Sequence, residues 1–158
     1  MTDARFADGA EQPLRLRALE PGDLTVISAL VQDGVFLRAD MRFARKARRF
    51  ALLLNRFRWE RSADTISPPE RVRAMLVIEG ALAVQARGLP QGDDIVLSLL
   101  SLDWQAAASP DDAPGGRLVL TLAGDAELAI TVEALEVVLQ DVTRPYAAPS
   151  GQSPRHPD

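Results

Sequence analysis

The residues of this chain that could carry out acid–base or metal chemistry are carboxylates in loops and at strand ends. Asp93-Asp94 and Asp111-Asp112 are adjacent pairs that could bind a hard cation together with backbone oxygens. Glu60 and Asp103 each neighbour a tryptophan at the end of a predicted strand, where they could act as acid and base if those strands lie together. Because loop carboxylates more often only solvate the surface, we assign no catalytic residue, metal or cofactor.

Other kinds of site are set aside by residue type and spacing. The single histidine, His156, lies near the C-terminus without a possible partner, so a histidine catalyst is not supported. Gly115-Gly116 is not followed by Lys-Ser/Thr or by a predicted helix, so it does not form a phosphate-binding loop. The chain has no cysteine, which excludes disulfides, thiolate zinc sites and a cysteine nucleophile. We favour a non-enzymatic protein and leave an enzyme with carboxylate and arginine chemistry open.

The distribution of charge is the strongest functional signal. Residues 38–61 hold nine basic residues against two acidic ones, whereas residues 89–142 hold ten acidic residues and one base, Arg117. A basic hairpin could bind RNA or another anionic ligand. It could instead contact an acidic protein, or neutralise the acidic half of its own chain or of a second copy. We favour the last two, because a pI near 5.1 is unlike that of dedicated nucleic-acid binders.

The candidate interaction surface is carried by the segment Arg48–Glu60 and the turn before it. Alternation with a period of two predicts a strand, with Phe57 and Trp59 on one face and Arg56 and Arg58 on the solvent face. The predicted surface residues are Arg42, Arg45, Lys46, Arg48, Arg49, Arg56, Arg58 and Trp59.

The elements that position this strand are read from the segments before it. Leu14–Leu19 alternates as a first strand, and an apolar stripe predicts a helix over Pro21–Asp33 with Gly34 as its C-cap. Val35–Met41 is a predicted strand that pairs with the central strand, so that Val35–Arg58 forms a hairpin with a basic tip.

The remaining strands follow from alternation and turn residues, and Gly124-Asp125 predicts a tight hairpin between two of them. Glu133–Val142 fits both a helix and a strand, and we favour a strand. Residues 50–60 resemble the segment 45 residues further on, an echo that we interpret as coincidence unless both tryptophans end equivalent strands. The predicted strands are Arg71–Ile78, Ala81–Ala86, Ile95–Trp104, Arg117–Ala123 and Ala126–Val132.

Together these elements predict an α+β fold. It is an antiparallel β-rich barrel or split sandwich of about seven or eight strands with one helix after the first strand. A barrel like that of pleckstrin-homology domains is the alternative if Glu133–Val142 is helical. We expect residues 1–13 to be flexible, residues 14–142 to form one domain and residues 143–158 to be a disordered tail. The predicted core is Leu16, Leu24, Ile27, Leu30, Phe50, Leu52, Leu54, Leu76, Ile78, Leu97, Leu99, Leu120, Leu122 and Ile130.

The chain also carries segments that recur together elsewhere: Leu14–Leu19, Asp23-Leu24, Gln32-Asp33, Arg48-Arg49-Phe50, Asn55-Arg56-Phe57, Trp59-Glu60, Leu97–Leu102 and Gly115-Gly116. In these it resembles a family of small alphaproteobacterial proteins that is known only as a domain of unknown function. The run Asn-Arg-Phe-x-Trp-Glu at residues 55–60 is the most specific feature, and the resemblance covers about Leu14–Val142. It implies a shared fold and implies no activity.

The function predicted from these observations is a non-enzymatic interaction or scaffold module that associates with itself or with an acidic protein. No apolar run approaches the roughly 20 residues that span a bilayer. The N-terminal residues lack the basic and apolar regions of a secretory signal. We therefore expect a cytoplasmic bacterial protein without a membrane partner.

Overall fold

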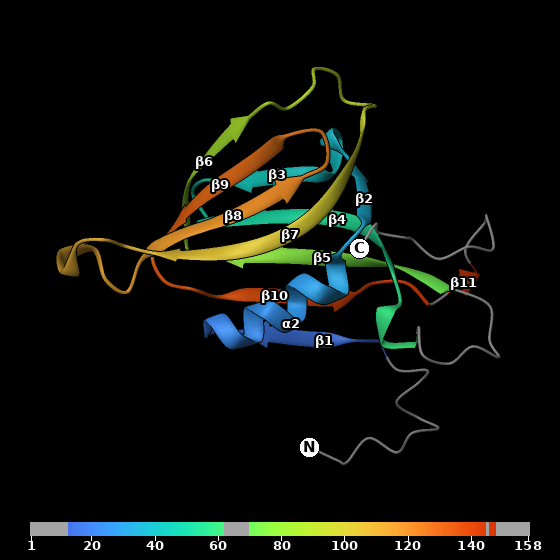
Figure 1. The fold of residues 1–158 in the computed structure, drawn as a ribbon, viewed down its shortest axis with the longest axis horizontal. Coiled ribbons are helices and arrows are strands. Elements are labelled where there is room, and N and C mark those ends of the chain that lie inside the picture. Colours follow the sequence, from blue (N-terminus) through green and yellow to red (C-terminus); the bar gives the residue numbers. More distant parts are fainter. Residues whose placement is uncertain (1–12, 62–69, 145, 148–158) are drawn as a thin grey trace, which may run out of the picture.

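The computed structural model describes residues 13–61, 70–144 and 146–147, and Figure 1 shows how their elements are arranged. One α-helix, α2 (Pro21–Val31), follows the first strand. Three short 3-10 helices are η1 (Arg38–Asp40), η2 (Trp59–Arg61) and η3 (Pro110–Asp112). The strands are β1 (Arg15–Ala18), β2 (Gly34–Leu37), β3 (Met41–Ala44), β4 (Arg49–Phe57), β5 (Glu70–Glu79), β6 (Ala81–Arg87), β7 (Val96–Ala106), β8 (Gly116–Leu122), β9 (Ala126–Val132), β10 (Val137–Asp141) and β11 (Tyr146–Ala147).

The described strands form one antiparallel sheet with the order β1-β10-β5-β4-β2-β7-β8-β9-β6, in which β3 also pairs with β4 and β11 with β5. The sheet is strongly curved, so that β6, at one end of this order, returns to the turn between β3 and β4 (Figure 1). There the Ala81 backbone N–H donates to the Arg48 carbonyl at 2.9 Å. An antiparallel β-rich fold with one helix after the first strand is therefore confirmed, as an open sheet.

The strand count is higher than predicted, since the described residues contribute 11 strands to the sheet. One reason is that the predicted strand Val35–Met41 is divided by η1. The Asp40 carboxylate accepts a hydrogen bond from the Leu37 N–H at 2.9 Å, which ends β2 before β3 begins. A second reason is that the ambiguous Glu133–Val142 segment contains β10, which pairs with both β1 and β5. The pleckstrin-homology alternative required a helix there, so its condition is not met.

The helix begins at Pro21, as predicted, and buries Leu24, Ile27 and Val31 at helical spacing. It ends two residues earlier than predicted, because Gln32 already has a non-helical ψ of 133°. Asp33 then adopts a positive φ of 64°. Gly34 is consequently not the C-cap. It starts β2, where an added Cβ would lie 2.4 Å from Leu54 Cδ1, so the absence of a side chain allows close packing. The prediction of the C-cap was wrong, although this position does require glycine because of its close packing against Leu54.

Two hairpins were predicted and both form. In the first, β3 and β4 pair so that Phe43 lies opposite Phe50, and the turn at residues 45–48 is basic. In the second, Gly124 and Asp125 both have positive φ values, 84° and 61°, between β8 and β9. The two tryptophans do not occupy equivalent positions, because Trp59 lies in η2 and Trp104 lies within β7. The condition for a true repeat is therefore not met.

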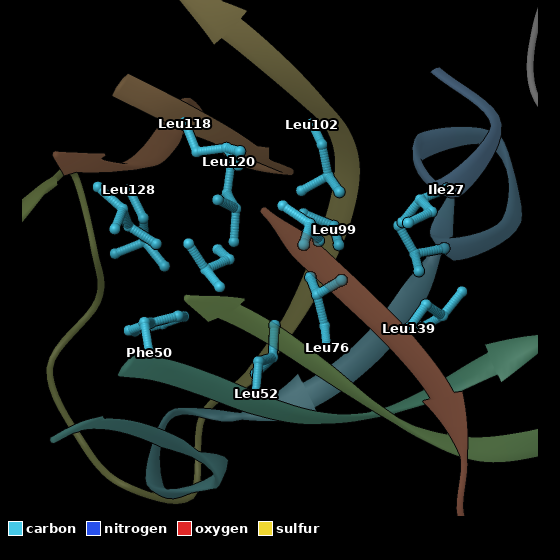
Figure 2. Packing of buried hydrophobic residues seen from close by; sticks show 14 of the residues in the cluster. Ile27, Phe50, Leu52, Leu76, Leu99, Leu102, Leu118, Leu120, Leu128 and Leu139 are labelled. Atoms are coloured by element: carbon cyan, nitrogen blue, oxygen red, sulfur yellow. The ribbon is translucent and has the colours of Figure 1, made fainter. Parts of the chain in front are cut away.

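The core is a single cluster enclosed by the curved sheet and closed at one end by α2 (Figure 2). Leucines of β8 and β9 point toward Phe50 and Leu52 of β4, and Ile27 of α2 lies near Leu139 of β10 (Figure 2). Every predicted core residue is buried except Leu16 and Leu30, which are partly buried and pack against the cluster. None of the helices in the described ranges has the length and apolar character that crossing a membrane requires.

Candidate functional site

The run Asn-Arg-Phe-x-Trp-Glu at residues 55–60 leads from the end of β4 into η2. Its first arginine, Arg56, is the most buried charged residue in the described part of the chain. Arg56 has 0% of its surface exposed. Its Nε and Nη2 donate to both carboxylate oxygens of Asp141 at 3.0 Å. Its Nη1 and Nη2 donate to the Glu60 carboxylate at 2.9 and 2.8 Å. The planar guanidinium is thus held in two bidentate pairs inside the molecule.

The contacts of Arg56 and Glu60 favour the charged forms of these two side chains. Burial alone would lower the pKa of Arg56, but hydrogen bonds and charges from Glu60 and Asp141 outweigh it and raise that pKa. Burial alone would raise the pKa of Glu60, but its hydrogen bonds and attraction to Arg56 lower it below the ordinary value of 4.5. Asp141 also accepts from the Leu14 backbone N–H at 3.2 Å, so the cluster connects β4, β10 and the chain just before β1.

Arg58 is also turned inward, with only 6% of its side chain exposed. It forms an ion pair with Glu70 at the start of β5, and its backbone N–H donates to the Glu70 carbonyl at 2.9 Å. Its Nε lies 3.8 Å from a Glu60 oxygen. The predicted display of Arg56 and Arg58 on the solvent face was therefore wrong, because the protein's own carboxylates bind both guanidinium groups.

The aromatic residues of the segment attach β4 to the helix. The Trp59 indole N–H donates to the Gln32 carbonyl, one residue past α2, at 2.9 Å. Phe57 packs edge-on against Trp59 with ring centroids 4.7 Å apart. Asn55 accepts a hydrogen bond from Arg71 on the neighbouring β5. Each side chain of the run from Asn55 to Glu60, Arg58 included, is thus engaged in contacts that hold β4, its neighbours and η2 together. Trp59 is only partly exposed.

The other predicted surface residues lie at the opposite end of β4, around the turn between β3 and β4. Arg48 and Arg49 are exposed and pair with Glu133 and Glu79, respectively. The remaining three, Arg42, Arg45 and Lys46, are exposed and have no carboxylate partner in the described part of the chain. The guanidinium of Arg45 lies over the Phe43 ring, 5.4 Å from its centroid. Only these five of the eight predicted residues gather on one surface.

The candidate acidic sites are dispersed. Glu60 is engaged by Arg56, while Asp103 lies on β7 and accepts from the Ser101 hydroxyl at 3.2 Å. Because β2 separates β4 from β7 in the sheet, the two carboxylates do not form an acid–base pair. Asp93-Asp94 and Asp111-Asp112 are exposed in separate loops. Within the described ranges, no group of three or more His, Cys, Asp or Glu residues is placed to hold a metal ion.

Two residues of the buried cluster, Asp141 and Glu70, were missed by sequence reasoning. Glu70 lies just before the predicted strand Arg71–Ile78, and Asp141 lies in the segment Glu133–Val142, which fits both a helix and a strand. A signal did exist for Asp141. Alternation along the strand places it on the same face as the buried Val137 and Leu139. A carboxylate at a core-facing position requires a buried cation, and Arg56 was the matching candidate.

Substitution of Glu60 by glutamine is expected to make the protein less sensitive to acid. The lowered pKa of Glu60 means that its ionised form stabilises the fold above pH 4.5, and that this contribution is lost as pH falls through the folded-state pKa. Urea unfolding from about pH 7 down to about pH 3 should therefore show a shallower loss of stability for E60Q than for the wild type below pH 4.5. E20Q, at an exposed glutamate without an ion pair in the described residues, should follow the wild type; an E60Q curve parallel to the wild-type curve contradicts the assignment.

The fold and this site define a class: a β-rich α+β domain with one helix, in which an internal ion-pair cluster joins the strand ends. The chain matches the model of the family described as protein of unknown function (DUF2948) over residues 14–156, and it belongs to that family. This confirms the predicted membership of a family with no known function. Searches of curated proteins and of solved structures found no match. An alphaproteobacterial origin and the diagnostic value of the Asn-Arg-Phe-x-Trp-Glu run stay predictions.

Proposed function

We propose that this domain is a non-enzymatic bacterial interaction module of the cytoplasm, which associates with a second copy of itself through the tip of the β3–β4 hairpin. The observation that supports the proposal is the group formed by Arg42, Arg45 and Lys46, called here the hairpin patch. These three exposed cations have no carboxylate partner among the described residues. They stand on a hairpin whose strands are fixed by the pairing of Phe43 with Phe50.

The acidic half of the chain offers the complementary surface. Within the described ranges its exposed aspartates have no cationic partner, in contrast to Glu127, Glu133 and Asp141. The same pairing of hairpin arginine with acidic-half carboxylate already occurs inside the chain, between Arg48 and Glu133. A second copy could extend this complementarity, since exposed basic and acidic surfaces attract over distances of about 10 Å at 0.1 M salt. These unpartnered carboxylates are Asp93, Asp94, Asp103, Asp111, Asp112 and Asp125.

The proposal predicts a salt-sensitive oligomer. Size-exclusion chromatography with light scattering should give a dimer or larger assembly at low salt and a monomer at high salt, because exposed charge pairs are screened. The double substitution R45E/K46E should give a monomer at both salt concentrations. R15E reverses an exposed base on β1, which β10 and β5 separate from the hairpin strand β4, and it should leave the assembly unchanged.

A strict monomer at every concentration and at low salt would overturn self-association. Titration with single-stranded RNA in the same samples then tests the alternative partner. Suppose that the wild type binds RNA, that this affinity falls steeply with salt, and that R45E/K46E does not bind RNA. The hairpin patch is then a phosphate-binding surface instead. If neither RNA nor a second copy binds, the hairpin patch has no partner of either kind.

A further inference from the structure

The structure contains a pocket of about 580 Å³ where β7, β8, β9 and β6 meet the loop between β7 and β8. This volume lies in the range of about 300–1,000 Å³ that small-molecule sites occupy. An apolar wall is formed by Leu82 and Ala106–Ala108. Leu82 is a large apolar residue with 40% of its surface exposed, so a ligand in the pocket could remove it from water.

A guanidinium group stands at one side of this pocket. Arg117 is the single base in residues 89–142, and it lies on the outer face of the sheet between Gln105 and Thr131 in the strand register. Its Nη2 donates to the Gln105 side-chain oxygen at 2.9 Å, and it has no carboxylate partner among the described residues. A second pocket, of about 540 Å³, also includes Arg117 in its lining, so the guanidinium is open on both sides. Most of its five N–H donors are thus available to an anion.

A carboxylate without a cation stands in the wall of the same pocket. Asp112, in η3, lines the pocket and forms no ion pair within the described ranges. Glu133 lines it as well, but its charge is already compensated by Arg48. The pocket therefore combines one unneutralised cation, one unneutralised anion and an apolar wall. A purely anionic or purely cationic ligand would satisfy only one of the two charges and would approach the other unfavourably.

We propose that this pocket binds a small zwitterion with an apolar body, of the size of an amino acid or a short peptide. The ligand carboxylate pairs with Arg117 and accepts from the Gln105 amide, whose oxygen is already occupied by Arg117. The ligand ammonium pairs with Asp112, and the apolar body covers Leu82 and Ala107. This pocket shares no residue with the hairpin patch, so the proposed ligand binding is tested independently of the proposed self-association.

The probes are leucine and leucyl-leucine, titrated into the isotope-labelled full chain and followed by NMR. A saturable shift of the backbone amides in Ala106–Ser109 and Gly115–Arg117 is expected with at least one of them. Tighter binding of leucine indicates a free amino acid as ligand, and tighter binding of leucyl-leucine indicates a peptide. Two analogues, 4-methylpentanoate without the amine and isoamylamine without the carboxylate, should each bind about tenfold more weakly or worse, because one charge-assisted hydrogen bond is lost.

The variants R117Q and D112N test the two charged contacts separately. Each should weaken binding of the better probe by about tenfold or more without changing the melting temperature, because both side chains are exposed. R87Q is the matched control, since Arg87 lines only the second pocket and pairs with Glu127. R45E/K46E should bind the probe normally. Absence of a saturable shift with both probes, or wild-type affinity of R117Q or D112N, or equal affinity for 4-methylpentanoate, overturns the proposal.

Discussion

Replacement of Arg56 by methionine is expected to lower the free energy of unfolding by about 3–5 kcal/mol, the range observed when one partner of a buried ion pair is removed. The substitution leaves Asp141, whose side chain is 5% exposed, and Glu60, which is 30% exposed, without their shared cation. Asp141 cannot turn to water, because β10 is paired on both sides. Urea denaturation at neutral pH measures the loss directly.

The matched control is R49M on the same strand. Arg49 pairs with Glu79, but 51% of its side chain is exposed, so its loss should cost no more than about 1 kcal/mol. A further variant separates the missing charge pair from lost packing. R56M combined with D141L replaces the pair by apolar groups, and it should be more stable than R56M alone. Equal losses for R56M and R49M would show that the buried cluster does not stabilise the fold as the geometry indicates.

The placement of Arg56 shows where sequence reasoning failed and why. Phe50, Leu52 and Leu54 were correctly assigned to the core. Because side chains of a strand alternate with a period of two, Arg56 lies on the same face as these three residues. The predicted solvent position instead followed the tendency of charged residues to lie outside. In the structure β4 pairs with β5 without interruption from Arg49 to Phe57, and without a bulge a strand cannot exchange its faces. Strand register therefore overrides the preference of a single side chain.

The features that could be predicted depend on residues close together in the chain. Alternation gave β9 with the bounds observed, Pro21 marked the start of α2, and Gly124-Asp125 marked a hairpin. The neutralisation of the acidic half within the chain was among the alternatives, and Arg48–Glu133 and Arg56–Asp141 pairs provide it. One partner of Arg56, Glu60, lies four residues away, whereas the other, Asp141, lies 85 residues away. The pairing with Asp141 therefore requires two distant strands to be matched and cannot be read from one segment alone.

The candidate site around Arg117 could not be predicted for the same reason. Its wall requires β6, β7, β8 and β9 to lie together, and their order in the sheet is set by long-range pairing rather than by any one segment. In the sequence, Arg117 stood out only as the single base within the acidic residues 89–142. The pocket beside Arg117 depends on the loop between β7 and β8, which folds back so that the Ala107 N–H donates to the Gly115 carbonyl at 3.0 Å. That return depends in turn on the two glycines at the start of β8.

Substitution of Gly116 by alanine is expected to destabilise the protein by about 1–3 kcal/mol, the range for forcing extra atoms into a packed site. An added Cβ would lie 2.4 Å from the Gln105 carbonyl oxygen and 2.7 Å from the Trp104 ring. The carbonyl belongs to the backbone of β7, which pairs with β8 at this point through Ala106 and Gly116, so relief requires the two strands to separate locally.

Gly22 provides the control, because an added Cβ there meets nothing within 4 Å. Since Gly22 lies in α2, G22A should leave stability unchanged or raise it by up to about 1 kcal/mol. The local origin of the G116A effect can be observed in the indole N–H signals, where that of Trp104 should shift and that of Trp59, which donates to Gln32, should not. If G116A has wild-type stability and the Trp104 signal does not shift, β7 and β8 lie further apart than the structure places them. The lining of the Arg117 pocket would then differ from the one described, because both strands contribute to it.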